Sequence, residues 1–204
     1  DQGKSAIFTL GIWCLNPAVV FNEITNKARS VILTSGTLSP METFSSELGT
    51  KFEHRLEALH VIPADQIWVG AISLGPKGCD LKGTFKELET FAFQDDIAES
   101  ILEIAKVIPD GLLCFLPSYS FMAKLVKRME DTGMYTALRK VKKIFVEPRQ
   151  GTTADFEAMM RQYYSTISGG KGAIFFAVFR GKVSEGLDFA DENARAVISI
   201  GIPF

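Results

Sequence analysis

The apolar run Ala173-Ile-Phe-Phe-Ala-Val-Phe179 is followed at once by Arg180-Gly-Lys-Val-Ser-Glu-Gly-Leu-Asp-Phe189. A continuous apolar run of this length is typical of a strand that is buried on both faces of a parallel sheet. The charged, hydroxyl and glycine residues behind it predict a loop at the carboxyl edge of that sheet, where α/β domains receive ligands. The stretch therefore predicts an α/β fold with a phosphate-handling loop.

Outward from this stretch, buried strands alternate with amphipathic helices. Apolar residues at three- and four-residue spacing predict helices over about 93–108, 119–129 and 153–167, and short apolar runs predict strands over 112–116, 143–146 and 196–200. Ser118 is predicted to cap the second helix, and Thr152-Thr-Ala-Asp155 resembles a capping box before the third. This alternation indicates a parallel sheet with helices on both faces.

The amino-terminal part has a less regular pattern. It predicts strands over 7–14, 30–34, 55–62 and 66–74, and helices over 17–28 and 41–48. Three glycines and a proline between Gly75 and Thr84 predict a loop, which is the best internal boundary.

Composition narrows the class of protein. The chain has 204 residues, of which 47% are hydrophobic and 23% charged, so one or two globular domains are expected. Its 22 Lys and Arg against 24 Asp and Glu give a net charge of −2, so any nucleic-acid binding must come from locally placed cations. Cys14, Cys79 and Cys114 lack metal-site spacing, which predicts a reducing compartment and no metal bound by this chain. No apolar run approaches the roughly 20 residues that span a bilayer, so no membrane partner is expected.

Three further segments occur with the Arg180 loop in a characteristic order. They are Val31-Ile-Leu-Thr-Ser-Gly-Thr-Leu-Ser-Pro40, Leu113-Cys-Phe-Leu-Pro-Ser-Tyr119 and Ala194-Arg-Ala-Val-Ile-Ser-Ile-Gly-Ile-Pro203. Over essentially its whole length, the chain resembles the XPD-like, iron–sulfur-containing DNA helicases of superfamily two. Segments 11–17, 38–49 and 75–78 distinguish members within that family. The resemblance implies a RecA-like fold, with residues 1–50 closing a first RecA-like domain and residues 51–204 forming most of a second.

The resemblance also implies a function. Members of this family are ATP-dependent helicases that move 5′ to 3′ along DNA and act in DNA repair or genome maintenance, which predicts a nuclear location. The expected cofactors of the complete motor are ATP and Mg²⁺. The iron–sulfur cluster of the family would be held by cysteines before Asp1, and not by this chain. The expected partners are single-stranded DNA, the remainder of the helicase chain and repair proteins.

The family's motifs assign roles to three groups of residues. Thr34, Ser35, Gly36 and Thr37 match the motif that couples the nucleotide site to the DNA groove. The predicted DNA contacts are Ser118, Tyr119, Lys182 and Ser184, with Ser118 and Tyr119 matching a motif whose backbone and hydroxyl contact DNA phosphates. The predicted nucleotide and lobe-interface residues are Arg180, Glu185, Gly186 and Asp188, with Asp188 as an acceptor for the ribose hydroxyl and Arg180 or Lys182 facing phosphate.

Each role has a simpler alternative. The coupling motif could be an ordinary strand-to-helix turn, Ser118 a plain helix cap, and the Arg180 loop a surface ion-pair network. The basic run Arg139–Lys143 either contacts the DNA backbone or forms a solvated helix end. Trp13 and Trp68 either stack on bases or belong to the core, and His54 and His60 lack neighbours that would complete a metal site.

Parts of a complete motor are missing from the sequence. A phosphate loop needs Ser or Thr after Gly-Lys, and neither follows the Gly-Lys pairs at 170–171 and 181–182. Asp191-Glu-Asn-Ala194 resembles a magnesium-holding acidic box, but it does not follow a continuous apolar strand. The arginine-finger motif would lie beyond Phe204. The chain alone is therefore expected to hydrolyse no ATP, and a non-catalytic RecA-like module acting through protein contacts remains the alternative.

Overall fold

The computed structural model describes residues 10–36, 38–58, 62–184 and 187–202. The chain divides into two compact units, Asp1–Trp68 and Val69–Phe204. Each unit is described by itself. Residues 51–68 fall within the first unit, and the sequence-based domain border after residue 50 stays a prediction.

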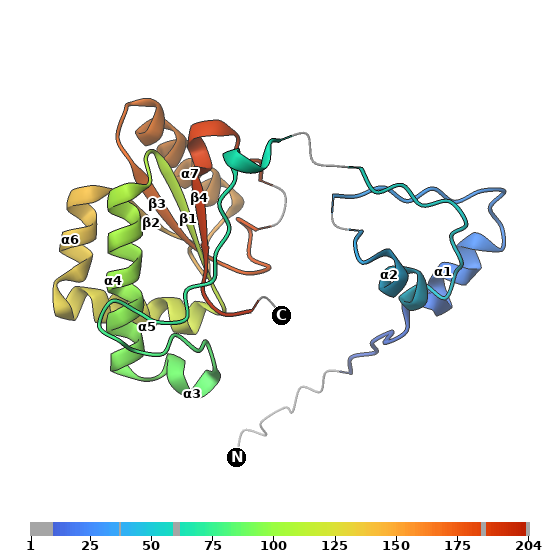
Figure 1. Ribbon diagram of the computed structural model, residues 1–204, viewed down its shortest axis with the longest axis horizontal. Coiled ribbons are helices and arrows are strands. Elements are labelled where there is room, and N and C mark those ends of the chain that lie inside the picture. The colour runs from blue at the N-terminus through green and yellow to red at the C-terminus, as the bar shows by residue number, and fades with distance from the viewer. Residues whose placement is uncertain (1–9, 37, 59–61, 185–186, 203–204) are drawn as a thin grey trace, which may run out of the picture. The chain divides into compact units, whose positions relative to one another are not determined.

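The second unit is built on a four-stranded parallel sheet (Figure 1). The strands are β1 (Gly111–Leu116), β2 (Lys143–Val146), β3 (Ala173–Val178) and β4 (Ala196–Ser199), in the order β2-β3-β1-β4. The two central strands pair over their full length, from Gly111 with Ala173 to Leu116 with Val178. Because all strands are parallel, the segments that follow them begin at one common edge. The predicted α/β fold is confirmed.

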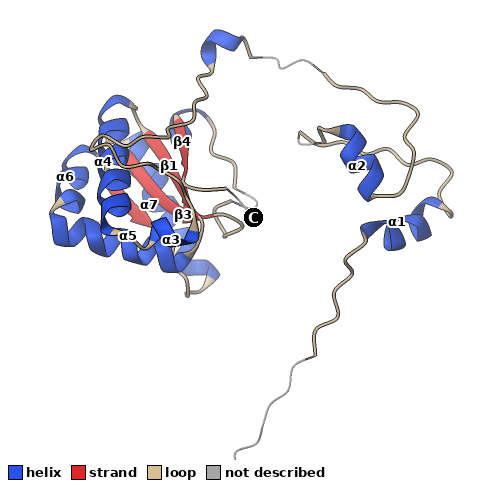
Figure 2. Ribbon diagram, turned by 60° about the horizontal axis from the view of Figure 1, so that its bottom comes forward, coloured by secondary structure: helices blue, strands red, loops and turns tan. Residues whose placement is uncertain are grey.

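Helices cover both faces of this sheet (Figure 2). The larger core packs α4 (Phe91–Val107), α5 (Tyr119–Thr132) and α6 (Met134–Val141) against one face, and the smaller core packs α7 (Thr153–Ser168) against the other. The largest fully buried side chains include Tyr163, Phe175 and Phe176. Neighbouring residues of β3 alternate between the two cores, which explains why the whole strand is apolar.

The ends of these helices follow the predicted capping chemistry. Thr152 and Asp155 form a reciprocal capping box at the start of α7. Gly133, with φ 80°, ends α5 in the left-handed conformation and starts α6, a helix that the sequence pattern did not predict. The exposed Arg139 and Lys140 lie in the last turn of α6, as expected for a solvated helix end, but Lys142 of the same basic run is 3% exposed and its ammonium donates to the Asp110 carbonyl at 2.8 Å.

The predicted loop over 75–84 is confirmed, and a buried carboxylate holds it. Asp96, on α4, is 0% exposed and accepts hydrogen bonds from the backbone N–H groups of Lys77 and Cys79, each at 2.7 Å. A Cβ at Gly75 would lie 2.4 Å from this carboxylate, so only glycine fits there. A short helix that the sequence did not predict, α3 (Phe85–Leu88), follows the loop.

The described residues of the first unit form the α-helices α1 (Pro17–Thr25) and α2 (Met41–Glu47), close to the predicted ranges, and the 3-10 helix η1 (Ala64–Gln66), which was not predicted. The four strands predicted before the loop at Gly75 are wrong over the part that the structure describes: residues 10–14, 30–34, 55–58 and 66–74 form no strand. The last of these segments runs into the second unit, where one isolated bridge joins Leu74 to Asp80. A strand requires a neighbour for its backbone N–H and C=O groups, and no ladder forms within these described residues.

Apolar side chains of the first unit also remain in solvent. Trp13 and Trp68 are 83% and 82% exposed, so the interpretation that these rings belong to a core is wrong. Neither α1 nor α2 contains a buried residue. Among the described residues of this unit, the apolar side chains therefore form no packed interior.

Candidate nucleic-acid interface

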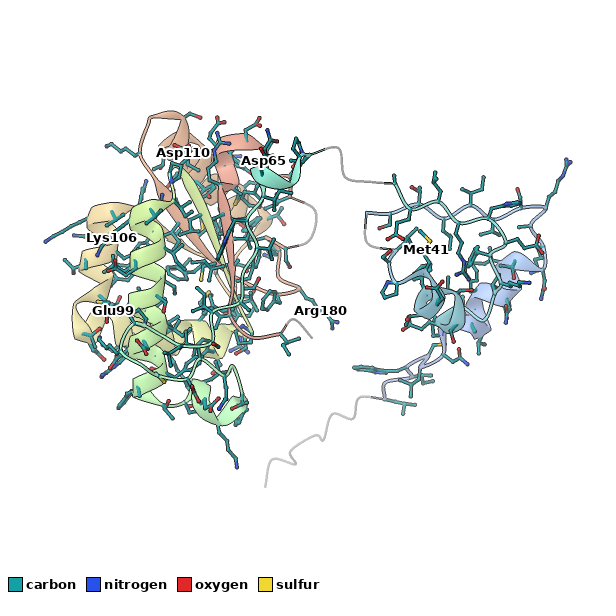
Figure 3. The ribbon with its side chains drawn as sticks, viewed as in Figure 1. Met41, Asp65, Glu99, Lys106, Asp110 and Arg180 are labelled. Atoms are coloured by element: carbon teal, nitrogen blue, oxygen red, sulfur yellow. The ribbon has the colours of Figure 1, made fainter. Side chains whose placement is uncertain are left out.

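The carboxyl edge of the sheet gathers the candidate residues of the second unit. The segment after β1 leads through Ser118 into α5, and the segment after β3 is the Arg180 loop. The two loops start side by side, because β1 and β3 are paired neighbours and the Phe179 N–H donates to the Leu116 carbonyl at 3.1 Å. Arg180 lies on the loop that leaves β3 (Figure 3).

Ser118 is the N-cap of α5, as predicted. Its side-chain oxygen accepts a hydrogen bond from the Phe121 N–H at 3.1 Å, and its backbone is extended, with φ −160° and ψ 156°. The hydroxyl proton is not used by this bond and remains a donor. The first N–H groups of a 14-residue helix and its dipole favour an anion at this end.

The Tyr119 side chain has a partner within the protein, and its predicted DNA contact stays a prediction. Its hydroxyl donates to Glu147 Oε1 at 3.0 Å. Burial, followed by this hydrogen bond to the carboxylate, raises the pKa of Tyr119, so the ring stays a neutral donor. The hydroxyl proton is therefore committed within the protein, and any phosphate contact at this position must come from the Tyr119 backbone.

Glu147 is the residue that the sequence interpretation missed. It directly follows β2 and is 1% exposed. Its Oε2 accepts from the Val178 N–H at 2.9 Å, and its Oε1 accepts from the Lys182 N–H at 2.7 Å as well as from Tyr119. A charged residue directly behind a predicted strand was the signal available in the sequence, since ligand sites of parallel sheets lie at that edge.

The shape of the Arg180 loop depends on this carboxylate. A Cβ at Gly181 would lie 2.6 and 2.7 Å from the two Glu147 oxygens, so no larger residue fits without a shift. Arg180 has φ 58°, a left-handed conformation that is uncommon for a residue with a side chain. Such a conformation persists only where the surroundings impose it.

The remaining loop residues are anchored on the side of α7. Val183 is 2% exposed and belongs to the smaller core, while the Lys182 ammonium lies 5.8 Å from the centre of the Phe156 ring. The Ser184 hydroxyl donates to the Gly181 carbonyl at 2.9 Å. Asp188 is exposed. The pKa of Tyr164 is raised, mainly because its hydroxyl is partly buried and also because the negative charge of Asp188 lies nearby.

The described part of the Arg180 loop forms no surface ion-pair network. Among the described residues, no ion pair joins Arg180, Lys182 or Asp188 to an opposite charge. The charges of Arg180 and Asp188 are exposed and remain available to a ligand. Glu185 and Gly186, which were also predicted to belong to the site, lie outside the described residues.

A hollow of about 670 Å³ lies beside the start of α5. Its lining includes Tyr119, Lys124, Lys127, Glu147 and Arg149. Lys124 and Lys127 are paired with Glu89 and Asp131 respectively, so their charges are largely compensated. Arg149 is exposed and adds positive charge at the end of β2.

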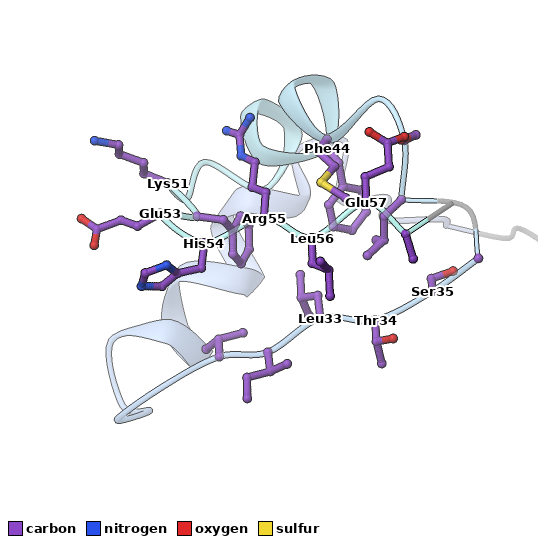
Figure 4. Close-up of a pocket in the computed structure, with 18 of the residues that line it drawn as sticks. Leu33, Thr34, Ser35, Phe44, Lys51, Glu53, His54, Arg55, Leu56 and Glu57 are labelled. Carbon is purple, nitrogen blue, oxygen red and sulfur yellow. The ribbon is translucent and has the colours of Figure 1, made fainter. Parts of the chain in front are cut away.

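The predicted coupling residues lie in the first unit. Thr34, Ser35 and Gly36 line a cavity of about 1080 Å³ between segments 30–41 and 51–58. The side chains of Leu33 and Leu56 point toward one another across it (Figure 4). Thr37 lies outside the described residues. This cavity belongs to the first unit, whereas the candidate interface belongs to the second unit.

The acidic segment Asp191–Ala194 is a short 3-10 helix directly before β4. It therefore lies at the amino edge of the sheet, opposite the candidate interface, and the Asn193 carbonyl accepts from the Tyr163 hydroxyl at 2.7 Å. Within residues 10–36, 38–58, 62–184 and 187–202, no group of three or more His, Cys, Asp or Glu side chains is placed to hold a metal ion. In the same residues, no helix has both the length and the apolar composition needed to cross a membrane.

Comparison with known proteins identifies relatives of this chain. The protein family described as "Helicase C-terminal domain" matches residues 101–204. The chain is 52% identical to the Fanconi anemia group J protein homolog of Gallus gallus, covering 98% of this chain and 16% of that protein. It is 43% identical to the regulator of telomere elongation helicase 1 homolog of Oryza sativa subsp. japonica, covering 96% of this chain and 20% of that protein.

Solved structures agree on the fold. Two that are titled "XPD_Helicase" and "XPD_APO" each match with a TM-score of 0.58 and 23% identity over 92% of this chain, which is 31% and 36% of those chains. The chain spans about a sixth to a fifth of the length of the curated relatives above. Segments 11–17, 38–49 and 75–78 favour a likeness to the Fanconi anaemia group J helicase, and the 52% identity to the group J homolog confirms that prediction. The chain belongs to the helicase C-terminal domain family.

Proposed function

We propose that the chain is part of an ATP-dependent 5′-to-3′ DNA helicase that acts in DNA repair or genome maintenance in the nucleus. Residues 1–50 would close a first RecA-like domain, and residues 51–204 would form most of a second. One observation carries the proposal: the start of α5 and the Arg180 loop meet at one sheet edge and both offer unpaired groups to an anion. The family relationship supplies the identity of that anion, the phosphate chain of single-stranded DNA.

In this proposal the two loops contact different parts of the DNA and the nucleotide. Ser118 and the first N–H groups of α5 bind one DNA phosphate, because donors and dipole point the same way. Lys182 and Ser184 border the same strand of DNA. Arg180, Glu185, Gly186 and Asp188 face the nucleotide between the lobes, with Arg180 toward phosphate and Asp188 toward the ribose. Thr34, Ser35, Gly36 and Thr37 couple the two events.

The chemistry of ATP hydrolysis belongs to the complete motor. The phosphate loop, the acidic box that holds Mg²⁺ and the arginine finger are not among the motifs of residues 1–204. The cluster cysteines are likewise expected outside this chain. The chain alone would bind DNA without turning over ATP, and the remainder of the helicase chain and repair proteins would be its partners.

A second candidate function is a non-catalytic module that acts through protein contacts. The exposed apolar side chains of the first unit favour it, since contiguous exposed apolar surface marks interaction sites. This candidate predicts no salt-dependent binding of DNA.

The test is a salt titration of the 204-residue chain against fluorescent oligothymidylate, with an ATPase assay in parallel. Binding should weaken with salt, and Lys182→Ala should lower the salt slope by about 0.7, as for the loss of one phosphate contact with single-stranded DNA. Lys106→Ala, which removes an exposed lysine of α4, is the matched control and should leave the slope unchanged. Salt-insensitive or absent binding would favour the protein-contact module.

Ser118→Ala needs a control of its own, because it removes a helix cap. Thr90 caps α4 in the same way, accepting from the Phe93 N–H at 3.3 Å. Both substitutions should lower stability by about 1 kcal/mol. Only Ser118→Ala should weaken DNA binding, whereas an equal loss in Thr90→Ala would show that Ser118 acts as a cap alone.

A further inference from the structure

The Glu147 carboxylate joins three segments that the proposed function uses separately. It stands at the end of β2, accepts the Tyr119 hydroxyl from the start of α5, and accepts the Val178 and Lys182 N–H groups from the two ends of the turn after β3. These bonds measure 3.0, 2.9 and 2.7 Å. These donors replace the water that the carboxylate gives up on burial.

Glu147 lies too deep to bind a ligand itself. It is 1% exposed, and its two oxygens already accept three hydrogen bonds. What it controls is the path of the loop. The turn from Val178 to Lys182 closes around the carboxylate, Gly181 leaves it room, and Arg180 is held in the left-handed conformation at the apex.

We propose that Glu147 is a positioning residue that fixes the Arg180 loop against the start of α5, so that both present their donors to one phosphate chain. This inference rests on the proposed function for the identity of the ligand. The effect of Glu147 on the conformation of the Arg180 loop is a property of the protein without DNA. Without the carboxylate, the Val178 and Lys182 N–H groups lose their acceptor, and the turn at Arg180 retains the weaker support of the bond from the Gly181 N–H to the Val178 carbonyl at 3.0 Å.

Glu147→Gln tests the role with little change in volume. A carboxamide has one acceptor oxygen, and its NH₂ group would face a donor, so at least one of the three bonds is lost. The Lys182 amide should then exchange with solvent about tenfold faster or more, and oligothymidylate affinity should fall about tenfold, as for the loss of a hydrogen bond to a charged group. Glu157→Gln, an exposed glutamate on α7, is the matched control and should change neither quantity.

A double-mutant cycle separates positioning from general stability. If Glu147 acts through the loop, Glu147→Gln should cost little further affinity once Lys182→Ala has removed the side chain that the loop presents to DNA. Fully additive losses would overturn the inference. Binding is measured well below the unfolding temperature of each variant, and Glu147→Asp, which keeps the charge, should recover part of the affinity that Glu147→Gln loses.

The failures of the two claims are distinguishable. No salt-dependent binding by the wild-type chain would overturn the proposed function, and with it any role of Glu147 toward phosphate. Normal wild-type binding with unchanged Lys182 exchange in Glu147→Gln would overturn the role of Glu147 alone. Faster exchange, weaker binding and a non-additive cycle together would establish it.

Discussion

Apolar runs of similar sequence have opposite environments in the two units of the chain. In the second unit, the apolar runs of β1 and β3 pair with neighbours and are buried on both faces. In the first unit, runs with a comparable pattern pair with nothing among the described residues, and Trp13 remains 83% exposed. An apolar run thus becomes a strand only where another strand satisfies its backbone and a helix covers its face.

The largest expected contrast comes from truncating one aromatic ring in each unit. Phe175, at 0% exposure, packs in the smaller core, and Phe175→Ala should lower the free energy of unfolding by about 3–5 kcal/mol. Trp13→Ala should change it by less than about 0.5 kcal/mol. Denaturant titration followed by circular dichroism measures both, and a similar loss in Trp13→Ala would show that the first unit has a core.

A second contrast uses glycines. Gly75→Ala places a Cβ 2.4 Å from the Asp96 carboxylate and should destabilise the second unit by about 1–3 kcal/mol. Gly36→Ala meets nothing within 4 Å in the first unit and should be close to neutral. Thermal unfolding of the two variants compares them, and a neutral Gly75→Ala would mean that the turn can move away from α4.

The smallest expected contrast is electrostatic. Arg128 holds the Asp95 carboxylate through two hydrogen bonds at 2.7 Å between α5 and α4, and these bonds lower the pKa of Asp95. A lowered folded-state pKa adds stability above the ordinary value of 3.8, and this stability is lost as the pH falls through the folded-state pKa. Asp95→Asn should therefore remove about 1 kcal/mol at pH 7 and flatten the acid limb of the stability curve.

The first unit provides the matching control for that ion pair. Arg55 and Glu42 form a more exposed pair there, with side chains 36% and 78% exposed. Glu42→Gln should change stability by less than about 0.5 kcal/mol at pH 7. Urea titrations at neutral and acid pH measure both variants, and equal effects would contradict the contrast between the units.

Sequence reasoning predicted the second unit well because its signals are local. Ser118 and the Thr152 capping box mark helix starts through bonds spanning three residues, and the apolar run of β3 marks a buried strand. It failed for the strands predicted before Gly75, since pairing depends on neighbours that a local pattern does not reveal. It also missed α6, whose start depends on the left-handed Gly133.

The candidate site was predicted in part for the same reason. The positions of Ser118 and the Arg180 loop follow from strand ends, which a sequence shows. The hydrogen bond from the Tyr119 hydroxyl to Glu147 joins residues 28 positions apart in the sequence, and the bond from the Lys182 N–H to Glu147 joins residues 35 positions apart. Such contacts appear only once the order of β2, β3 and β1 in the sheet is known.

The most direct test of the central claim is hydrogen exchange of the 204-residue chain with and without saturating oligothymidylate. The account predicts slower exchange on binding at the start of α5, around Ser118 and Tyr119, and in the loop from Arg180 to Ser184. Helix α6, which begins at Met134, should be unchanged. Protection confined to the first unit, or no protection anywhere, would contradict the assignment of the DNA interface to the carboxyl edge of this sheet.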